Sequence, residues 1–242
     1  MNTNRRTAII VGVLYIIGTV AGILSVVFST PILNGPDFLS KVSANENQFI
    51  IAALFVLLMG LALALVPVML FPILKKQNEA LALGYVVFRG ALETVTYIAL
   101  VISWFLLLIL SREYVAAGAP DTSYFQTLGA LFLKGNDSIS TILAIVFCLG
   151  ALMLYYLLYR SKLIPRWISV WGFIAITLHL ATGFLIIFQL MSPFSTINLV
   201  MEFPIFLQEM VMALWLIVKG FNPAAVDSLS AKTATNELMS AS

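Results

Sequence analysis

Residues 80–110 read ALALGYVVFRGALETVTYIALVISWFLLLIL, and this stretch carries only two charged side chains, Arg89 and Glu93. An apolar run of roughly 18 or more residues is long enough to cross a bilayer as a helix. The whole chain has the same character, because 61% of its 242 residues are hydrophobic and 10% are charged. Soluble domains carry about 25% charged residues. The runs are continuously apolar rather than alternating, which argues against a β-barrel. The sequence therefore predicts an all-α, multi-pass membrane protein that sits in a lipid bilayer.

Six apolar segments predict a bundle of six transmembrane helices, which forms one domain over residues 1–221. The expected spans are approximately 8–29, 49–74, 80–111, 138–160, 166–191 and 196–220. Between the third and fourth spans, residues 124–133 (YFQTLGALFL) predict a short helix at the membrane interface. The tail, residues 222–242, is small and polar, and we expect it to be a disordered cytoplasmic segment.

The basic residues predict the orientation of the bundle, because loops rich in Lys and Arg stay in the cytoplasm. Three basic residues fall on one side of the predicted spans, namely Lys41, Arg112 and Lys134. Nine fall on the other side, namely Arg5, Arg6, Lys75, Lys76, Arg160, Lys162, Arg166, Lys219 and Lys232. We therefore expect both termini in the cytoplasm.

Four ionisable side chains are expected at similar depth on three different helices. With a rise of about 1.5 Å per residue, they lie about 13–20 Å from the cytoplasmic face of a hydrocarbon core about 30 Å thick. They are Arg89, Glu93, His179 and Glu209. A charged side chain that faces lipid at this depth costs about 2.5–3.5 kcal/mol. We therefore expect one interior polar cluster.

Within that cluster, Arg89 and Glu93 are spaced i,i+4 and share a helix face. Glu209 offers Arg89 a second carboxylate, and His179 is expected to bond whichever carboxylate is left. Supporting hydrogen bonds are expected from polar side chains nearby in the sequence, namely Gln208, Thr94, Thr177 and Thr182. Glu202 lies nearer the outer face, at about 25 Å.

Several kinds of site are not indicated by the sequence. One histidine and one cysteine make a His/Cys zinc or haem site improbable, and we expect neither a metal nor a cofactor. No H-E-x-x-H, G-x-S-x-G or P-loop motif occurs, so no catalytic residue can be named. A net charge of +2 with scattered basic residues argues against nucleic-acid binding. Gly18 and Gly22 form a G-x-x-x-G pattern, which we interpret as packing of the first helix inside the monomer.

Four segments occur in an order that resembles one known family. They are RRTAIIVGVLYIIGTVAGI (5–23), the arginine in the third span, LIPRWISVWG (163–172) and EMVMALWLIVKGF (209–221). Together they resemble the DUF4386 family of bacterial membrane proteins of unknown function. The most specific elements are PRW with Gly172, and Glu209 with the closing LWLIVKGF. The resemblance implies a bacterial inner-membrane protein of about six spans, and it implies no catalytic residue.

Three hypotheses for function remain open. In the first, the cluster binds or moves a small solute or protons: Arg89 holds an anionic group or a resting carboxylate, Glu93 and Glu209 take up protons, and His179 relays them. Dimerisation would supply the larger scaffold that secondary transporters usually have. A polar path to one aqueous face would favour this hypothesis.

The second hypothesis is an intramembrane enzyme acting on a lipid, quinone or isoprenoid. Glu93 or Glu209 would act with His179 in acid–base catalysis, and Arg89 would hold an oxygen of the substrate. A deep pocket open sideways to lipid, with His179 at its wall, would favour it, and the missing metal-ligand and nucleophile motifs count against it. The third hypothesis is an accessory or assembly protein in which the charges only fix helix packing, and it predicts no cavity.

Overall fold

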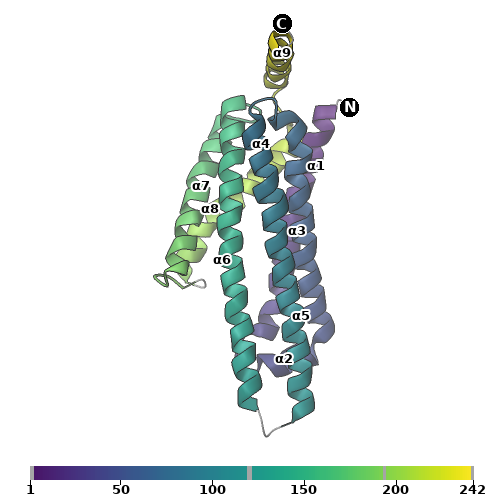
Figure 1. Ribbon diagram of the computed structural model, residues 1–242, viewed down its shortest axis with the longest axis vertical. Helices are drawn as coiled ribbons and strands as arrows, with labels where there is room; N and C mark the ends of the chain where they lie inside the picture. Colours follow the sequence, from purple (N-terminus) through teal and green to yellow (C-terminus); the bar gives the residue numbers. More distant parts are fainter. Residues whose placement is uncertain (1–2, 119–121, 193–194, 241–242) are drawn as a thin grey trace.

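The computed structural model describes residues 3–118, 122–192 and 195–240, and every regular element in these ranges is a helix (Figure 1). Six helical segments are long and apolar enough to cross a membrane, as the sequence predicted. They are Thr3–Leu33, Glu46–Leu74, Glu79–Ala117, Ser123–Ser161, Arg166–Ile187 and Thr196–Val218. This is the architecture of a multi-pass membrane protein.

The elements follow the chain in simple order. They are α1 (Thr3–Leu33), α2 (Phe38–Ala44), α3 (Glu46–Leu74), α4 (Glu79–Tyr85), the π-helical segment η1 (Val86–Leu92), α5 (Glu93–Ala117), α6 (Thr122–Ser161), α7 (Arg166–Ile187), α8 (Thr196–Val218) and α9 (Pro223–Ser240). The third predicted span is therefore built from α4, η1 and α5 in one continuous rod. Figure 1 shows that α7 and α8 form a hairpin that ends well short of the far ends of α5 and α6.

Short polar caps define where the helices turn. The Asn78 side chain accepts a hydrogen bond from the Leu81 backbone nitrogen at 2.9 Å and starts α4. Ser195 accepts from the Asn198 nitrogen at 3.2 Å and starts α8. At the other end of α8, Gly220 takes a positive φ of 74°, a conformation that favours glycine after a helix end. These groups mark the helix ends at the turns before α4, before α8 and after α8.

The glycine pair in the first span packs inside the monomer, as predicted. A Cβ atom placed on Gly18 would lie 2.8 Å from Leu63 Cγ, and one on Gly22 would lie 2.8 Å from Met59 Sδ. Both neighbours belong to α3, so the small residues allow close approach of α1 and α3.

Residues 124–133 differ from the prediction of a separate interfacial helix, because they continue directly into the 40-residue helix α6. The segment contains no proline to break the helix, and it has a packing partner. A Cβ atom on Gly129 would lie 2.8 Å from the Phe38 ring of α2. Phe125 and Phe132 also pack against the cluster that contains Phe38 and Leu39. The segment is thus covered by α2 rather than lying alone at the interface.

The tail also differs from the prediction, since the structure describes helix α9 over Pro223–Ser240 where we expected disorder. Asn222 caps its first turn by accepting from the Ala224 nitrogen at 3.2 Å. Ala225, Val226 and Leu229 are buried in the main core. These three apolar residues share a helix face, a pattern that the small and polar composition of the tail concealed.

Nine of the 13 basic residues lie in segments at one end of the bundle, the end where α1 begins and α9 lies in Figure 1. The Arg5 guanidinium donates to the Leu216 and Val218 carbonyl oxygens at 3.0 and 3.1 Å. It thereby satisfies free carbonyl groups at the end of α8. Which side of the membrane this end faces stays a prediction.

Candidate functional site

The π-helical segment η1 positions the central arginine. In a π-helix the backbone hydrogen bonds run from i to i+5, and such segments often mark functional sites. Thr94 donates its hydroxyl to the Gly90 carbonyl at 2.6 Å, close to where η1 passes into α5. A Cβ atom on Gly150 of α6 would lie only 3.1 Å from the Arg89 backbone nitrogen. The missing side chain of Gly150 therefore lets α6 lie directly against η1.

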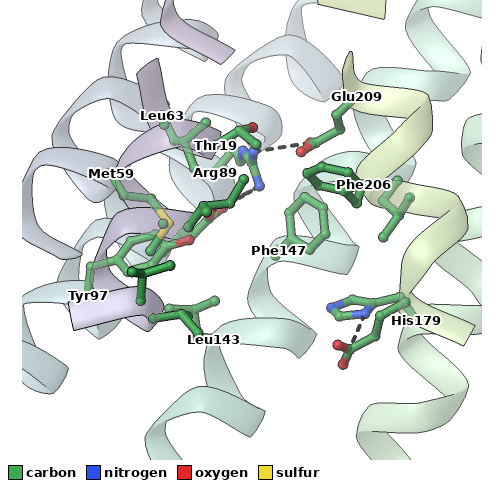
Figure 2. Close-up of a pocket in the computed structure, with 18 residues that line it drawn as sticks. Thr19, Met59, Leu63, Arg89, Tyr97, Leu143, Phe147, His179, Phe206 and Glu209 are labelled. Atoms are coloured by element: carbon green, nitrogen blue, oxygen red, sulfur yellow. Dashed lines mark hydrogen bonds and ion pairs between the residues drawn. The ribbon is translucent and has the colours of Figure 1, made fainter. Parts of the chain in front are cut away.

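The structure brings Arg89, Glu93 and Glu209 together, from η1, α5 and α8 (Figure 2). Arg89 Nη1 donates to both carboxylate oxygens of Glu93 at 3.1 Å, and Nη2 donates to Glu209 Oε1 at 3.2 Å. The guanidinium carbon also lies 4.4 Å from the centre of the Phe147 ring, in cation–π range. Arg89 and Glu93 are buried, whereas Glu209 is partly exposed. The predicted i,i+4 pair and its second carboxylate are both present.

His179 does not join this cluster. Its Nδ1 lies 3.7 Å from Glu202 Oε1, and its ring packs edge-on against Phe147 with centroids 5.6 Å apart. Glu202 in turn accepts a hydrogen bond from Asn198 Nδ2 at 3.0 Å. Phe147 lies between Arg89 and His179 (Figure 2). It thus separates the triad of Arg89, Glu93 and Glu209 from the pair of His179 and Glu202. The structure therefore has two charged clusters where we expected one, because the depth of a residue along a helix does not say which way its side chain points.

The expected supporting residues bond elsewhere. Gln208 is buried, accepts from the Tyr155 hydroxyl at 2.6 Å and donates to the Ile168 carbonyl at 3.1 Å. Thr182 donates to the His179 carbonyl at 2.8 Å, and Thr177 donates to the Phe173 carbonyl at 2.7 Å. The hydroxyls of these threonines and of Thr94 therefore bond to their own helix backbone. Gln208 joins α6, α7 and α8 instead of meeting the triad.

A cavity of about 490 Å³ connects the two charged groups. Its polar wall is formed by Arg89, Glu93, Tyr97, His179, Glu202 and Glu209, and the rest of its lining is mainly apolar. On one side it is bordered by exposed apolar residues of α1 and α8, among them Val26, Val27 and Phe206. Because these side chains face the surroundings of the bundle, the cavity opens sideways between α1 and α8.

Two further hollows lie near the α7–α8 turn, and the first of them adjoins the cavity. One, of about 200 Å³, shares Glu202 with the cavity and is also lined by Asp137, Thr141 and Asn198. The other, of about 700 Å³, shares Asp137 and Thr141 with the first hollow and reaches Gln189 beyond the end of α7. Polar side chains therefore extend from the turn to the His179–Glu202 pair.

The opposite side of the triad is closed by buried aromatic side chains. The Tyr15 and Tyr85 hydroxyls lie 3.4 Å apart, and Tyr155 bonds to Gln208. All three tyrosines are at most 1% exposed. A Cβ atom on Gly172 would lie 2.6 Å from Tyr155 Cζ, so the glycine of the PRW segment makes room for this ring.

Tyr97 and Phe147 are two of the cavity residues that the sequence reasoning missed. Tyr97 lies one turn beyond Glu93, on the same helix face, so the i,i+4 rule applied once more would have found it. Phe147 has no distinguishing signal, because it is one of 17 phenylalanines in an apolar chain. Within residues 3–118, 122–192 and 195–240, no three His, Cys, Asp or Glu side chains come together in a way that could hold a metal ion.

Comparison with known families supports the resemblance seen in the sequence. The sequence model of the family described as "Domain of unknown function (DUF4386)" matches residues 10–220, nearly the whole chain. The chain belongs to the DUF4386 family. No curated protein and no solved structure matches it. The matched DUF4386 region runs from α1 to the end of α8 and contains every residue that lines the cavity.

Proposed function

We propose that this DUF4386 protein is a bacterial inner-membrane protein that binds a small solute and protons in its central cavity and moves them across the membrane. Glu209 and Glu202 are the proton-binding groups, and both termini lie in the cytoplasm. The observation that carries this proposal is the single cavity whose wall holds both the Arg89 triad and the His179–Glu202 pair. An accessory protein with purely structural charges has no need of such a cavity.

The charge balance of the cavity supports proton binding. Its wall holds three carboxylates, one guanidinium and one imidazole. Even with His179 protonated, one carboxylate has no opposite charge. An uncompensated charge in an apolar interior costs several kcal/mol, so the surplus carboxylate takes up a proton or a cation.

The two ends of the cavity support a transport cycle. Asp137, Asn198 and Glu202 extend polar groups toward the α7–α8 turn. The other end is closed by the buried tyrosines Tyr15 and Tyr85. A cavity that is closed toward one end and continued by polar groups toward the other is the arrangement expected of one state in alternating access.

The sideways opening between α1 and α8 favours a second candidate, an enzyme that acts on a lipid or isoprenoid. In that case Arg89 would hold an oxygen of the substrate. Phe147 keeps His179 away from Glu93 and Glu209, so the acid–base pair would have to be His179 and Glu202. The Nδ1–Oε1 distance of 3.7 Å is longer than a hydrogen bond. Transport is therefore the better supported function.

The test is proton movement in liposomes that contain the purified protein and a trapped pH-sensitive dye. Under an imposed pH difference and membrane potential, we expect faster proton flux than in empty liposomes. Glu209→Gln should reduce that flux at least tenfold. Glu46→Gln, which removes a carboxylate from the exposed pair with Arg112, is the matched control and should leave it unchanged. Flux no faster than in empty liposomes, or unaffected by Glu209→Gln in a folded variant, would rule the proposal out.

A further inference from the structure

The charged groups of the cavity differ in how far a ligand can reach them. The Arg89 side chain is 3% exposed, whereas Glu209 is 16% and Glu202 is 38% exposed. The guanidinium lies beneath Glu209, and its side-chain hydrogen bonds go to the carboxylates of Glu93 and Glu209. A molecule in the cavity therefore meets carboxylates before it meets the arginine.

This order decides the charge of the ligand. An anion would have to displace Glu209 from Arg89 and would add negative charge to a wall that already has a surplus of it. Like charges brought together in a low dielectric repel strongly. A cation instead compensates the surplus carboxylate without breaking any bond of the triad.

The rest of the cavity lining indicates the chemical character of the uncharged part of the ligand. Most of the wall is apolar, and the aromatic rings of Tyr97, Phe147 and Phe206 contribute to it. Aromatic faces attract cations as well as apolar groups. A volume of about 490 Å³ falls within the range of roughly 300–1,000 Å³ that is typical of pockets for drug-sized ligands.

The route by which a ligand reaches the cavity also favours a ligand that is mainly apolar. Val26 and Val27 of α1 border the cavity, and their side chains are exposed on the surface of a span. A solute dissolved in the bilayer can therefore reach the carboxylates without crossing a polar surface. A small hydrophilic cation would have no such access from the lipid.

We propose that the cavity binds an apolar organic cation, which enters from the bilayer between α1 and α8 and places its charge between Glu209 and Glu202. This inference rests on the proposed function and names its solute: the bound cation takes the place of a proton on these carboxylates.

The experiment compares two probes of the same shape and opposite charge, tetraphenylphosphonium and tetraphenylborate. Each is titrated into the protein in nanodiscs of zwitterionic lipid, with empty nanodiscs as the background. We expect saturable binding of tetraphenylphosphonium and none of tetraphenylborate. Binding of the cation should release protons to an unbuffered solution. Equal binding of both probes, or stronger binding of tetraphenylborate, would overturn the inference.

Variants locate the bound charge. Glu209→Gln and Glu202→Gln should each weaken tetraphenylphosphonium binding at least tenfold, Glu209→Asp should retain most of it, and Glu46→Gln should not change it. Unchanged affinity in both Gln variants, each checked for a single symmetric gel-filtration peak, contradicts the inference. Val26→Trp, at the lateral opening, should slow association more than it changes the equilibrium affinity.

The outcome separates this inference from the function on which it rests. Proton flux that depends on Glu209, without tetraphenylphosphonium binding, rejects the cationic solute and retains proton movement. Binding that depends on Glu209, without any flux, retains the site and rejects transport.

Discussion

Two arginine–glutamate pairs in this molecule have the same chemistry and opposite surroundings. At one end of the bundle, Arg112 binds Glu46 through two hydrogen bonds of 2.8 and 2.7 Å, and the arginine is 52% exposed. In the middle of the bundle, Arg89 binds Glu93 at 3.1 Å with both side chains nearly inaccessible. The shorter contacts are therefore found in the exposed pair, where surface ion pairs contribute only about 0–1 kcal/mol.

The difference teaches that contact distance does not measure the role of an ion pair. The interior pair loses the hydration of both partners, and its attraction does no more than offset that cost. It also carries a second carboxylate, Glu209, that the exposed pair lacks. Polar contacts between membrane helices contribute only about 0.6 kcal/mol on average. Stability alone is thus a weak reason for the triad, whereas a surplus carboxylate beside a cavity has a chemical use.

The largest effect is expected from Arg89→Leu. This change leaves the buried Glu93 and the partly exposed Glu209 without a cation, and breaking a buried pair in this way costs about 3–5 kcal/mol. We expect the free energy of unfolding, measured by denaturation in mixed detergent micelles, to fall by that amount. Arg112→Leu at the exposed pair is the matched control and should cost under about 1 kcal/mol.

A compensating variant sharpens this result. When Glu93→Gln and Glu209→Gln are added to Arg89→Leu, no net charge remains in the triad, and much of the lost stability should return. Equal losses for Arg89→Leu and Arg112→Leu would mean that burial does not distinguish the two pairs.

The interior triad could be predicted from the sequence for a physical reason. Helix rise fixes the depth of each side chain, and the i,i+4 spacing fixes the shared face of Arg89 and Glu93. The rotation of α7 about its axis depends on packing, and for that reason His179 was expected in the cluster with Arg89 rather than beside Glu202. The hydrogen-bond partner of Gln208 was missed in the same way. Gln208 lies next to Glu209 in the chain, but its side chain faces α6.

The fold was predictable to a similar extent. Apolar length gives the six spans, because only helices satisfy the backbone of a chain that is continuously apolar across a bilayer. The continuity of α6 and the helix α9 depend instead on tertiary contacts with Phe38 and with the main core. Composition carries no signal for contacts of this kind.

An intermediate effect is expected from Gly150→Val, which breaks the contact that holds η1. Its Cβ would lie 3.1 Å from the Arg89 nitrogen and 3.3 Å from Arg89 Cβ. Overpacking of this kind costs about 1–3 kcal/mol. We expect a lower melting temperature in detergent and tighter tetraphenylphosphonium binding, because the displaced η1 moves Arg89 away from Glu209 and leaves that carboxylate without its cation.

Gly135→Val is the control for this change, since it lies in the same helix α6 and a Cβ there would have nothing within 4 Å. It should leave binding unchanged. If both valine variants change binding equally, helix propensity rather than the position of η1 is responsible.

The smallest effect is expected from salt, and it separates the two pairs most cleanly. Raising ionic strength from 0.1 to 1 M shortens the Debye length from about 10 to about 3 Å, which screens exposed charges and leaves buried ones nearly unaffected. A double-mutant cycle of Arg112→Gln and Glu46→Gln should give a coupling energy below about 1 kcal/mol that falls further in 1 M salt. The same cycle on Arg89→Gln and Glu93→Gln should give a larger coupling that salt does not change. A salt-sensitive coupling at the interior pair would mean that water and ions reach Arg89, and then the covered guanidinium could no longer explain a preference for cations.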